Sequence, residues 1–264
     1  MASPIVLITD FGTKDPYVAV MKGVILSKNP GLNIIDGTHE IFSQDIKQAS
    51  YFLNSILKWY PPDTVFICVV DPGVGSKRDI LVLKINKCIV AAPDNGLLSD
   101  VLKNFEAEGI YSVLKKNFIS STTFDGRDIF APLGAELAQK GTNIPCLKKI
   151  SLDQIIIKDY FLKPQLCENL IIGCVVNIDK FGNLITNISK TDALKVFSTT
   201  ENLKAFIDEL ELGKVMHTYS SSLEGSLSAL WNSSDFLEIA CINASARKKI
   251  CDLSDKKIFL KFFE

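Results

Sequence analysis

The chain has 264 residues, 47% of them hydrophobic and 22% charged, and this composition excludes a disordered protein. The formal net charge of −1, with acids and bases mixed along the chain, argues against nucleic acid or a membrane surface as the main partner. Seven scattered cysteines, together with an amino terminus that lacks a signal-peptide pattern, lead us to expect reduced thiols, no metal site and a cytoplasmic location.

The first half of the chain alternates apolar runs with amphipathic segments. Strands are predicted over 4–9, 32–35, 64–70, 80–85, 89–92 and 110–114, and helices over 16–28, 45–59, 97–102 and 129–139. Asp15 and Pro16 are expected to cap and to begin the first helix. Continuous apolar runs are typical of a sheet covered on both faces. Residues 1–145 are therefore predicted to form a layered, Rossmann-like α/β domain.

The second half has a different pattern. Residues 146–168 lose the alternation, and their lysines and Pro164 are typical of a linker. Short β-type segments then follow at close intervals, over 170–178, 184–188, 203–207, 214–219, 226–231, 236–242 and 257–262. Residues 169–264 are therefore predicted to form a small C-terminal β-barrel domain.

The stretch from Val69 to Asp79 carries the most distinctive local pattern. A predicted buried strand ends in Asp71, Pro72 biases that aspartate toward extended geometry, and Arg78 follows seven residues later. An isolated Asp-Pro-Gly segment would be an ordinary turn with a surface ion pair. At the end of a buried strand, the same segment would bring an acid and a base to the edge of a sheet, where α/β folds bind ligands.

Further polar groups stand at the ends of predicted strands or at the start of a predicted helix: Asp10, Asp15, Asp94, Asn95, Asp125, Arg127 and Asp128. Taken singly, such residues serve equally well as a helix cap, a tight turn or a surface ion pair. Because the carboxyl ends of neighbouring parallel strands meet at one edge of a sheet, we expect these groups to share one rim and to form the ligand site.

Two features outside that rim need separate interpretation. The segment from Asn177 to Asn187 has the composition of a β-hairpin with a Phe-Gly-Asn turn, and its alternative is a loop that faces a cationic ligand. Of the two histidines, His39 is expected to be a solvated loop residue, with a place on the rim as the alternative, and His217 is expected to be structural.

Six segments spread over the chain carry a more specific signal. They are Thr9-Asp10-Phe11-Gly12-x-x-Asp15, Val70-Asp71-Pro72-Gly73-Val74-Gly75-x-x-Arg78, Pro93-Asp94-Asn95-Gly96, Thr123-Phe124-x-Gly126-Arg127-Asp128-Ile129-Phe130-Ala131-Pro132, Asp179-x-Phe181-Gly182-Asn183-x-x-Thr186-Asn187 and Phe236-Leu237-Glu238-Ile239-Ala240. In this order they resemble the motifs of the S-adenosylmethionine (SAM) hydroxide adenosyltransferases, relatives of the fluorinase and the chlorinase.

The resemblance implies hydrolysis of SAM to adenosine and L-methionine by in-line attack of water or hydroxide at C5′, with SAM as the substrate and no further cofactor or metal. It also implies a homotrimer whose active sites lie between subunits, each formed by the N-terminal domain of one subunit and the C-terminal domain of its neighbour. One alternative is a SAM-binding protein with little turnover. Another is halide transfer, against which the carboxylate of Asp71 argues, since the halogenases lack an acid there.

The resemblance also implies roles for individual residues. The positive charge of a sulfonium, by itself, suggests a cation–π contact with Phe11 or Phe181, and the shared rim leads us to expect Asp10, Asp94 and Asn95 to line the site. By position, the resemblance assigns Asp15 to the ribose hydroxyls, Asp179 to the methionine ammonium and Ser233 to the methionine carboxylate. Adenine would be bound by Asn183 and by the backbone of Ile242, Asn243 and Ala244.

One catalytic position departs from the family. Asp71 and Arg78 match the first two members of an Asp–Arg–His trio that handles the water in the hydrolytic branch, but Asp125 stands in the place of the histidine. We expect Asp125 to take over as the proton acceptor once it is ionised. The enzyme is therefore predicted to be slower than a relative with histidine there, with a pH optimum shifted to lower pH.

Overall fold

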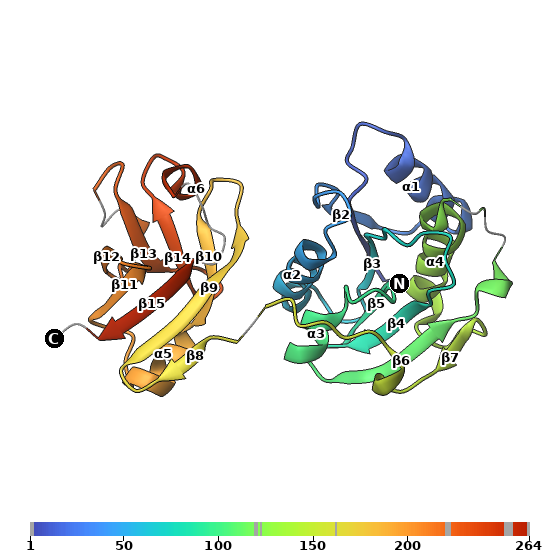
Figure 1. Cartoon of the computed structure of the whole chain (residues 1–264). Helices are drawn as coiled ribbons and strands as arrows, with labels where there is room; N and C mark the ends of the chain where they lie inside the picture. Colours follow the sequence, from blue (N-terminus) through green and yellow to red (C-terminus); the bar gives the residue numbers. More distant parts are fainter. Residues whose placement is uncertain are drawn as a thin grey trace. The chain divides into compact units, whose positions relative to one another are not determined.

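The structure is a computed structural model that describes residues 3–118, 121, 123–161, 163–219, 223–250 and 256–262. Contacts within the chain divide it into two compact units, Met1–Tyr160 and Phe161–Glu264. The two units are visible in Figure 1, and each is described by itself below. The first is an α/β unit and the second is built mainly of antiparallel strands, so the predicted fold class is confirmed.

The first unit contains a seven-stranded mixed sheet in the order β2-β1-β3-β5-β4-β6-β7. Its strands are β1 (Ile5–Thr9), β2 (Ile34–Thr38), β3 (Val65–Val69), β4 (Ile80–Ile85), β5 (Cys88–Pro93), β6 (Ala107–Val113) and β7 (Leu147–Lys149). Its helices are α1 (Tyr17–Lys28), α2 (Ile46–Ile56), α3 (Ser99–Asn104) and α4 (Ala131–Lys140). Short helical turns are η1 (Leu57–Trp59), η2 (Lys115–Asn117), η3 (Gly126–Phe130) and η4 (Leu152–Gln154).

Apolar side chains cover both faces of this sheet. In β1, Ile5 and Leu7 belong to one core cluster, with residues of α1 and α4, whereas Val6 and Ile8 belong to another, with residues of α2 and α3. The two pairs of helices lie on opposite faces of the sheet (Figure 1). Successive side chains of a strand point to opposite faces, so a strand covered on both sides must be apolar throughout. That is the physical reason for the continuous apolar runs.

All four predicted helices are found, with local differences at their first turns. Asp45 caps α2 as the sequence suggests, because its side chain accepts a hydrogen bond from the backbone N–H of Gln48. The cap predicted for α1 is wrong: Pro16 itself is the N-cap, and no side chain caps that helix. The helix predicted over 129–139 is preceded by the π-helical turn η3, a feature that often marks functional sites.

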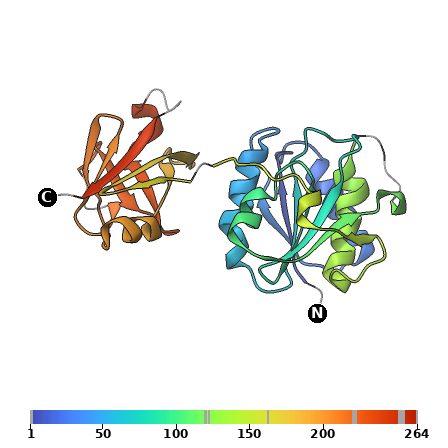
Figure 2. The ribbon, with the colours of Figure 1, turned by 60° about the horizontal axis from the view of Figure 1, so that its bottom comes forward.

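The second unit contains an eight-stranded antiparallel sheet in the order β12-β11-β15-β9-β10-β14-β13, with β8 paired to β9. Its strands are β8 (Gln165–Cys167), β9 (Leu170–Ile178), β10 (Leu184–Ser189), β11 (Leu203–Ile207), β12 (Leu210–Lys214), β13 (Leu227–Trp231), β14 (Phe236–Cys241) and β15 (Lys257–Phe262). Its helices are α5 (Lys190–Phe197) and α6 (Ala246–Lys249). A bridge between Met216 and Leu230 links the two ends of the sheet, which makes it nearly barrel-like (Figure 2).

Two features of this unit differ from the prediction. The strand predicted over 214–219 is wrong: β12 ends at Lys214 and forms a hairpin with β11 whose turn places Asp208 at a φ of 49°. Helix α5 was not predicted, although Ser189 and Asp192 form a capping box at its start. The sequence does not predict α5 because its apolar pattern is short and lies between the apolar runs of two strands, β10 and β11.

The segment predicted as a linker contains short secondary structure in each unit. β7 pairs with β6 at the edge of the first sheet, and β8 pairs with β9 in the second. Both are three-residue strands with mostly exposed side chains. Short polar edge strands resemble linkers in composition, because only one of their sides is hydrogen-bonded and neither face is buried.

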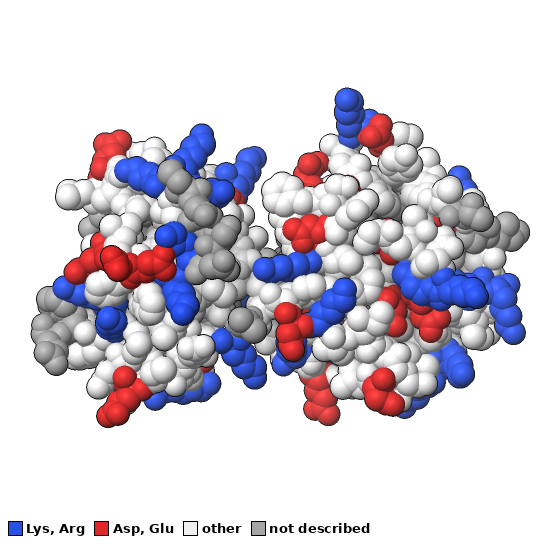
Figure 3. Space-filling view, viewed as in Figure 1, with Lys and Arg blue, Asp and Glu red and all other residues white. Residues whose placement is uncertain are grey.

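Charges on the surface are mixed. In the view of Figure 3, lysines and arginines lie beside aspartates and glutamates on both units. None of the helices in the described part of the chain has the length and apolar character needed to cross a membrane.

Candidate active site

Three carboxylates stand at one edge of the first sheet. β1, β3 and β5 are parallel neighbours, and Asp10, Asp71 and Asp94 follow their carboxyl ends. The antiparallel strand β4 begins at the same edge, because Ile80 pairs with Pro93, and Arg78 lies just before it. The predicted rim of polar groups therefore exists, and the antiparallel insertion of β4 is what delivers the base to it.

Arg78 binds two carboxylates at this edge. Its Nη2 atom donates a hydrogen bond to Oδ2 of Asp125 at 3.0 Å and also pairs with Oδ2 of Asp71. The three side chains are only 4–9% exposed. Nε of Arg78 is buried and has no hydrogen-bond partner within the described residues. The Asp71–Arg78–Asp125 cluster is thus a buried polar group of two acids and one base. Within it, the Nε–H of Arg78 is available to donate a hydrogen bond to a ligand.

The loop between Asp71 and Arg78 is fixed by its own short-range hydrogen bonds. Oδ1 of Asp71 accepts the N–H of Gly73 at 3.1 Å, and Oγ of Ser76 accepts the N–H of Arg78 at 3.3 Å. The Nζ atom of Lys115 lies 3.5 Å from the carbonyl oxygen of Ser76. Burial and the neighbouring positive charge of Arg78 lower the pKa of Lys115, although nearby carboxylates oppose the shift.

Asp125 reaches the cluster from the start of the turn η3 and is itself buried. The preceding residue, Phe124, packs against two rings of the amino-terminal segment. Its ring centroid lies 5.8 Å from that of Phe11 and 5.3 Å from that of Tyr17. Edge-to-face contacts of this kind fix ring orientation. The aromatic group thus ties the segment that carries Asp125 to the segment that follows β1.

Arg127 and Asp128 form the ion pair suggested by their positions. Nε and Nη2 of Arg127 donate to the two carboxylate oxygens of Asp128 at 2.6 and 3.1 Å. The N–H of Ser121 also donates to Asp128, at 2.6 Å. The hydrogen bond from Arg127 is the main reason that the pKa of Asp128 is lowered to about 2. This pair braces the start of the helical segment and does not contact the Asp71–Arg78–Asp125 cluster in any hydrogen bond described.

Asp10, Phe11 and Asp15 share one loop between β1 and α1. Oδ2 of Asp10 accepts the N–H of Gln44 at 2.8 Å, and Phe11 belongs to the aromatic group just described. Asp15 is exposed, and its carboxylate makes no cap for α1. An exposed carboxylate next to the rim remains available to a ligand, which is compatible with the predicted ribose contact.

Asp94 and Asn95 hold loops of the first unit together. Oδ1 of Asp94 accepts the N–H of Ile156 at 2.9 Å, and Nδ2 of Asn95 donates to the carbonyl oxygen of Val70 at 3.0 Å. Burial raises the pKa of Asp94, and the charge of Asp79 adds to that effect. Both residues stand on the predicted rim, and both have backbone partners far away in the sequence that no local pattern could reveal.

The structure contradicts the expected solvated position of His39 and agrees with the alternative, a place on the rim. This residue is not solvated: it is 4% exposed, and its ring contacts Thr9 and Asp36 on the two neighbouring strands β1 and β2. His217, in contrast, is exposed, with Nε2 3.3 Å from Glu201. The available signal for His39 was its position directly after a strand parallel to β1, which brings it to the same sheet edge as Asp10.

In the second unit, Asp179 organises the loop between β9 and β10. Its Oδ1 accepts the N–H groups of Phe181 at 2.9 Å and Asn183 at 2.8 Å, and its Oδ2 accepts Nδ2 of Asn183 at 2.9 Å. Phe181 is 76% exposed at the tip of this loop, whereas Asn183 is buried. The loop therefore presents an exposed aromatic ring on a turn that is held by three hydrogen bonds to Asp179. Such a loop is compatible both with a β-hairpin turn and with a loop that faces a cationic ligand.

The segment Ile242–Ala244 lies at the same end of the sheet as that loop, and Ser233 does not. The N–H of Arg247 donates to the carbonyl oxygen of Gly182 at 2.9 Å, which joins the Asp179–Asn183 loop to the start of α6. Ser233 is exposed in the turn between β13 and β14, before β14 begins, whereas Ile242 follows the end of β14. The length of one strand thus separates Ser233 from the other predicted contacts of this unit.

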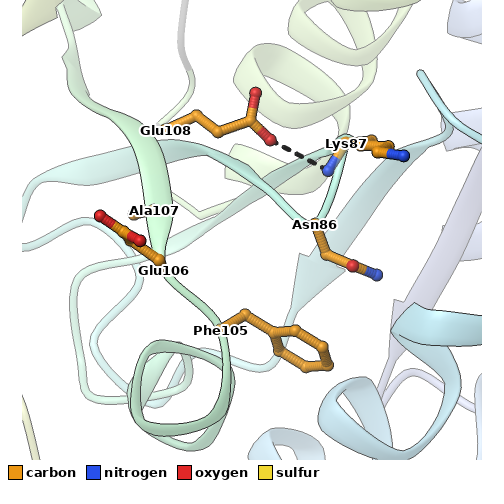
Figure 4. A pocket seen from close by; sticks show the side chains of 6 residues that line it. All are labelled: Asn86, Lys87, Phe105, Glu106, Ala107 and Glu108. Carbon is orange, nitrogen blue, oxygen red and sulfur yellow. Dashed lines mark hydrogen bonds between the residues drawn. The ribbon is translucent and has the colours of Figure 1, made fainter.

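A shallow pocket lies at the opposite edge of the first sheet. It has a volume of about 370 Å³ and is lined by Asn86, Lys87, Phe105, Glu106, Ala107 and Glu108 (Figure 4). The N–H of Lys87 donates to Oε1 of Glu108 at 3.1 Å across it. Asn86 and Lys87 form the turn that follows β4, so this pocket is remote from Arg78, which precedes β4. It contains none of the predicted site residues, and the residues described include no group of three or more metal-binding side chains.

Comparisons with known proteins identify the family of the chain. Residues 5–146 match the family model described as SAM hydroxide adenosyltransferase N-terminal domain, and residues 173–252 match that of the C-terminal domain. The chain is 33% identical over 254 residues to the (R)-S-adenosyl-L-methionine hydrolase of Methanocaldococcus jannaschii, covering 92% of this chain and 90% of that protein. It is 28% identical over 221 residues to the fluorinase of Actinoplanes sp., covering 72% of this chain and 73% of that protein.

A solved structure has a similar fold. The crystal structure of an uncharacterized conserved protein from Thermotoga maritima is 32% identical and superposes with a TM-score of 0.87, covering 97% of this chain and 99% of that chain. The two family models match consecutive parts of the chain and together span both units. The resemblance inferred from the six motifs is thereby confirmed, and the chain belongs to the SAM hydroxide adenosyltransferase family.

Proposed function

We propose that the protein hydrolyses SAM to adenosine and L-methionine. The observation that carries this proposal is the buried Asp71–Arg78–Asp125 cluster at the ligand-binding edge of the first sheet. The hydrolase of Methanocaldococcus jannaschii, similar to this chain over almost its whole length, supports the same activity. Its name specifies the (R) epimer of the substrate, and we extend that preference to this protein.

The reaction has simple requirements. The water oxygen forms a bond to C5′, the C5′–S bond breaks, and its electron pair goes to sulfur, which leaves as the neutral thioether of methionine. A sulfonium leaves without protonation, so the protein must place the water in line and remove its proton. Opposite charges on nucleophile and sulfonium cancel during the reaction, so a site that excludes bulk water favours it.

The cluster can meet both requirements. Asp71 would accept one hydrogen of the water and so direct its oxygen toward C5′, while Asp125 would receive the proton. Arg78, which binds both carboxylates through one nitrogen, would hold them at a fixed spacing. Its remaining Nε–H provides a donor for the water or for the hydroxide that forms.

The other predicted residues would bind the substrate. We assign the sulfonium to the ring of Phe11 or Phe181, and the ribose hydroxyls to Asp15. Asp10, Asp94 and Asn95 would shape the rim around them. The second unit would supply contacts to the amino acid and the base, with the ammonium assigned to Asp179, and adenine to Asn183, Ile242, Asn243 and Ala244. The methionine carboxylate is not assigned to Ser233, because this residue lies one strand's length away from Asp179.

The assembly and location follow from the same proposal. The acid–base cluster lies in the first unit and the proposed ammonium and adenine contacts lie in the second, so a complete site needs both. We propose a homotrimer in which the first unit of one subunit and the second unit of its neighbour form each site. The reaction would need no cofactor beyond the substrate. We also propose a cytoplasmic location, where the seven scattered cysteines would remain reduced.

The proposal is tested by incubating the protein with each sulfur epimer of SAM in ¹⁸O-labelled water. Chromatography and mass spectrometry should detect methionine and adenosine, with the label at the 5′-hydroxyl. Asp71→Asn should reduce the rate by about 10²-fold or more. Asp79→Asn is the matched control, because Asp79 is exposed and contacts Arg78 only through its backbone oxygen.

The same incubation separates the alternatives. Tight binding of SAM without release of adenosine would contradict hydrolysis and support a binding protein. Formation of 5′-halo-adenosine in the presence of fluoride or chloride would support halide transfer, the activity suggested by the name of the fluorinase relative. Unlabelled adenosine would exclude attack by water at C5′.

A further inference from the structure

The segment Asp10–Gly12, here called the substrate loop, is fixed at several points by the chain that follows β2. The carbonyl oxygen of His39 accepts the N–H of Gly12 at 2.8 Å. Oδ2 of Asp10 accepts the N–H of Gln44 at 2.8 Å. Gly12 has a φ of +64°, so the backbone turns sharply at the point where His39 holds it. The loop conformation therefore depends on the placement of residues 39–44.

The ring of His39 provides a further link, through Thr9. Its Nδ1 lies 2.9 Å from Oγ1 of Thr9, and the same oxygen accepts the N–H of Phe11 at 3.3 Å. Thr9 is fully buried and His39 is 4% exposed, so bulk water does not compete for these bonds. His39 thus holds the start of the loop through its ring and the end of the loop through its backbone.

The second ring nitrogen is held on the opposite side. Nε2 of His39 lies 2.9 Å from Oδ1 of Asp36, whose other oxygen pairs with Nζ of Lys22 at 2.7 Å. Burial alone would raise the pKa of Asp36, but hydrogen bonds from Lys22 and His39 outweigh it and lower that pKa. Asp36 is therefore an ionised acceptor, and the charged side chains of α1 and β2 next to the ring are Lys22 and Asp36.

The direction of each hydrogen bond follows from these partners. Oγ1 of Thr9 accepts from Phe11, so its own proton is free to be donated to Nδ1 of His39. Asp36, as a carboxylate, can only accept, so Nε2 of His39 must carry the ring proton. With Nδ1 accepting from Thr9 and Nε2 donating to Asp36, each of these groups has a hydrogen-bond partner.

We propose that His39 is a positioning residue for the substrate loop, and that its ring, with Nδ1 toward Thr9 and a proton on Nε2 toward Asp36, couples Asp10 and Phe11 to the Asp36–Lys22 pair. This inference rests on the proposed function, in which the substrate loop contacts SAM. His39 acts through Thr9 and Gly12, so its loss should weaken substrate binding more than it slows the chemical step.

The chain offers a matched control, because it has only two histidines and His217 is exposed. His39→Ala should raise KM for SAM about tenfold and change kcat less than about threefold, whereas His217→Ala should change neither. His39→Asn, which retains one acceptor and one donor, should recover part of the loss. A His39→Ala variant with an unchanged KM would overturn the proposal, and so would one whose kcat falls as much as KM rises.

A double-mutant cycle tests the link to Thr9. Thr9→Val removes the hydroxyl and should raise KM as much as His39→Ala, and the double variant should be no worse than either single variant. Additive losses would overturn the proposal. Thr9→Val and His39→Asn are small changes, so the test stands even where His39→Ala fails to fold.

Two measurements separate this inference from the proposed function. Long-range ¹H–¹⁵N correlation spectra of the two histidine rings, assigned with His217→Ala, should show the Nε2-protonated tautomer for His39, and the Nδ1-protonated form would overturn the inference. If the protein releases no adenosine, the proposed function fails, and calorimetric binding of SAM replaces KM. His39→Ala should then weaken binding about tenfold, and equal affinity would overturn the inference.

Discussion

Asp71 and Asp125 accept hydrogen bonds from one and the same atom, Nη2 of Arg78. The two acids come from different parts of the fold, one from the end of β3 and the other from the start of η3. A guanidinium has five N–H donors in a fixed plane, so it can hold two carboxylates at a defined spacing where an ammonium could not. The consequences of this shared donor can be measured in several ways.

Replacing Arg78 separates charge from geometry. Arg78→Met leaves two buried carboxylates without a cation, and the free energy of unfolding should fall by about 3–5 kcal/mol. Arg78→Lys retains the charge but not the planar donor. Its free energy of unfolding should therefore fall by less than that of Arg78→Met, while its kcat should fall by about tenfold or more. Urea denaturation and rate measurements on both variants provide the check, and a Met variant as stable as the native protein would contradict it.

Asp125→His should shift the acidic limb of the pH–rate profile to higher pH. A carboxyl ordinarily loses its proton near pH 4 and an imidazole near roughly pH 6.5, so a base made of histidine becomes active only at higher pH. The profile of kcat/KM between about pH 4 and 9 measures the effect. Identical limbs in both proteins would show that Asp125 is not the proton acceptor, while Asp125→Asn should lose most of the activity at every pH.

Asp128 should make the stability of the protein sensitive to acid. Its pKa in the folded state is lowered to about 2, below the ordinary value, so its contribution is present at neutral pH. That contribution should be lost as the pH falls from roughly 4 toward 2. The difference in unfolding free energy between the native protein and Asp128→Asn should therefore shrink over this range. A difference that stays constant over this range would contradict the prediction.

Gly182 should tolerate no side chain. Its φ is +85°, and a Cβ atom there would lie 2.0 Å from Oγ of Ser245, so Gly182→Ala should distort the Asp179–Asn183 loop. Gly213 provides the control, because its φ is +83° but nothing lies within 4 Å of a Cβ atom. Gly213→Ala should cost about 1 kcal/mol of stability and leave KM unchanged. Gly182→Ala should cost more and raise KM, and equal effects of the two changes would contradict the assignment of the loop to substrate binding.

Local sequence patterns were sufficient for the architecture and for part of the site. Apolar runs followed by Asp10, Asp71 and Asp94 identified three strands and the edge at which they end. This was possible because the apolar pattern of a strand, and the residue at which the strand ends, are both encoded by neighbouring residues. The six motifs, in their order along the chain, were also sufficient to identify the family. Composition failed for β7 and β8, since short edge strands have no buried face to make them apolar.

The sequence by itself determined which residue types stand at the sheet edge, because each strand, turn and acid is encoded by its immediate neighbours. Only the tertiary structure decided which of them meet: that Asp71 and Asp125 share Arg78, that Asp94 holds the backbone of Ile156, and that His39 is buried between two strands. Those contacts join residues far apart in the chain. They depend on strand order and on the antiparallel insertion of β4, which are set by packing of the whole core and leave no local trace.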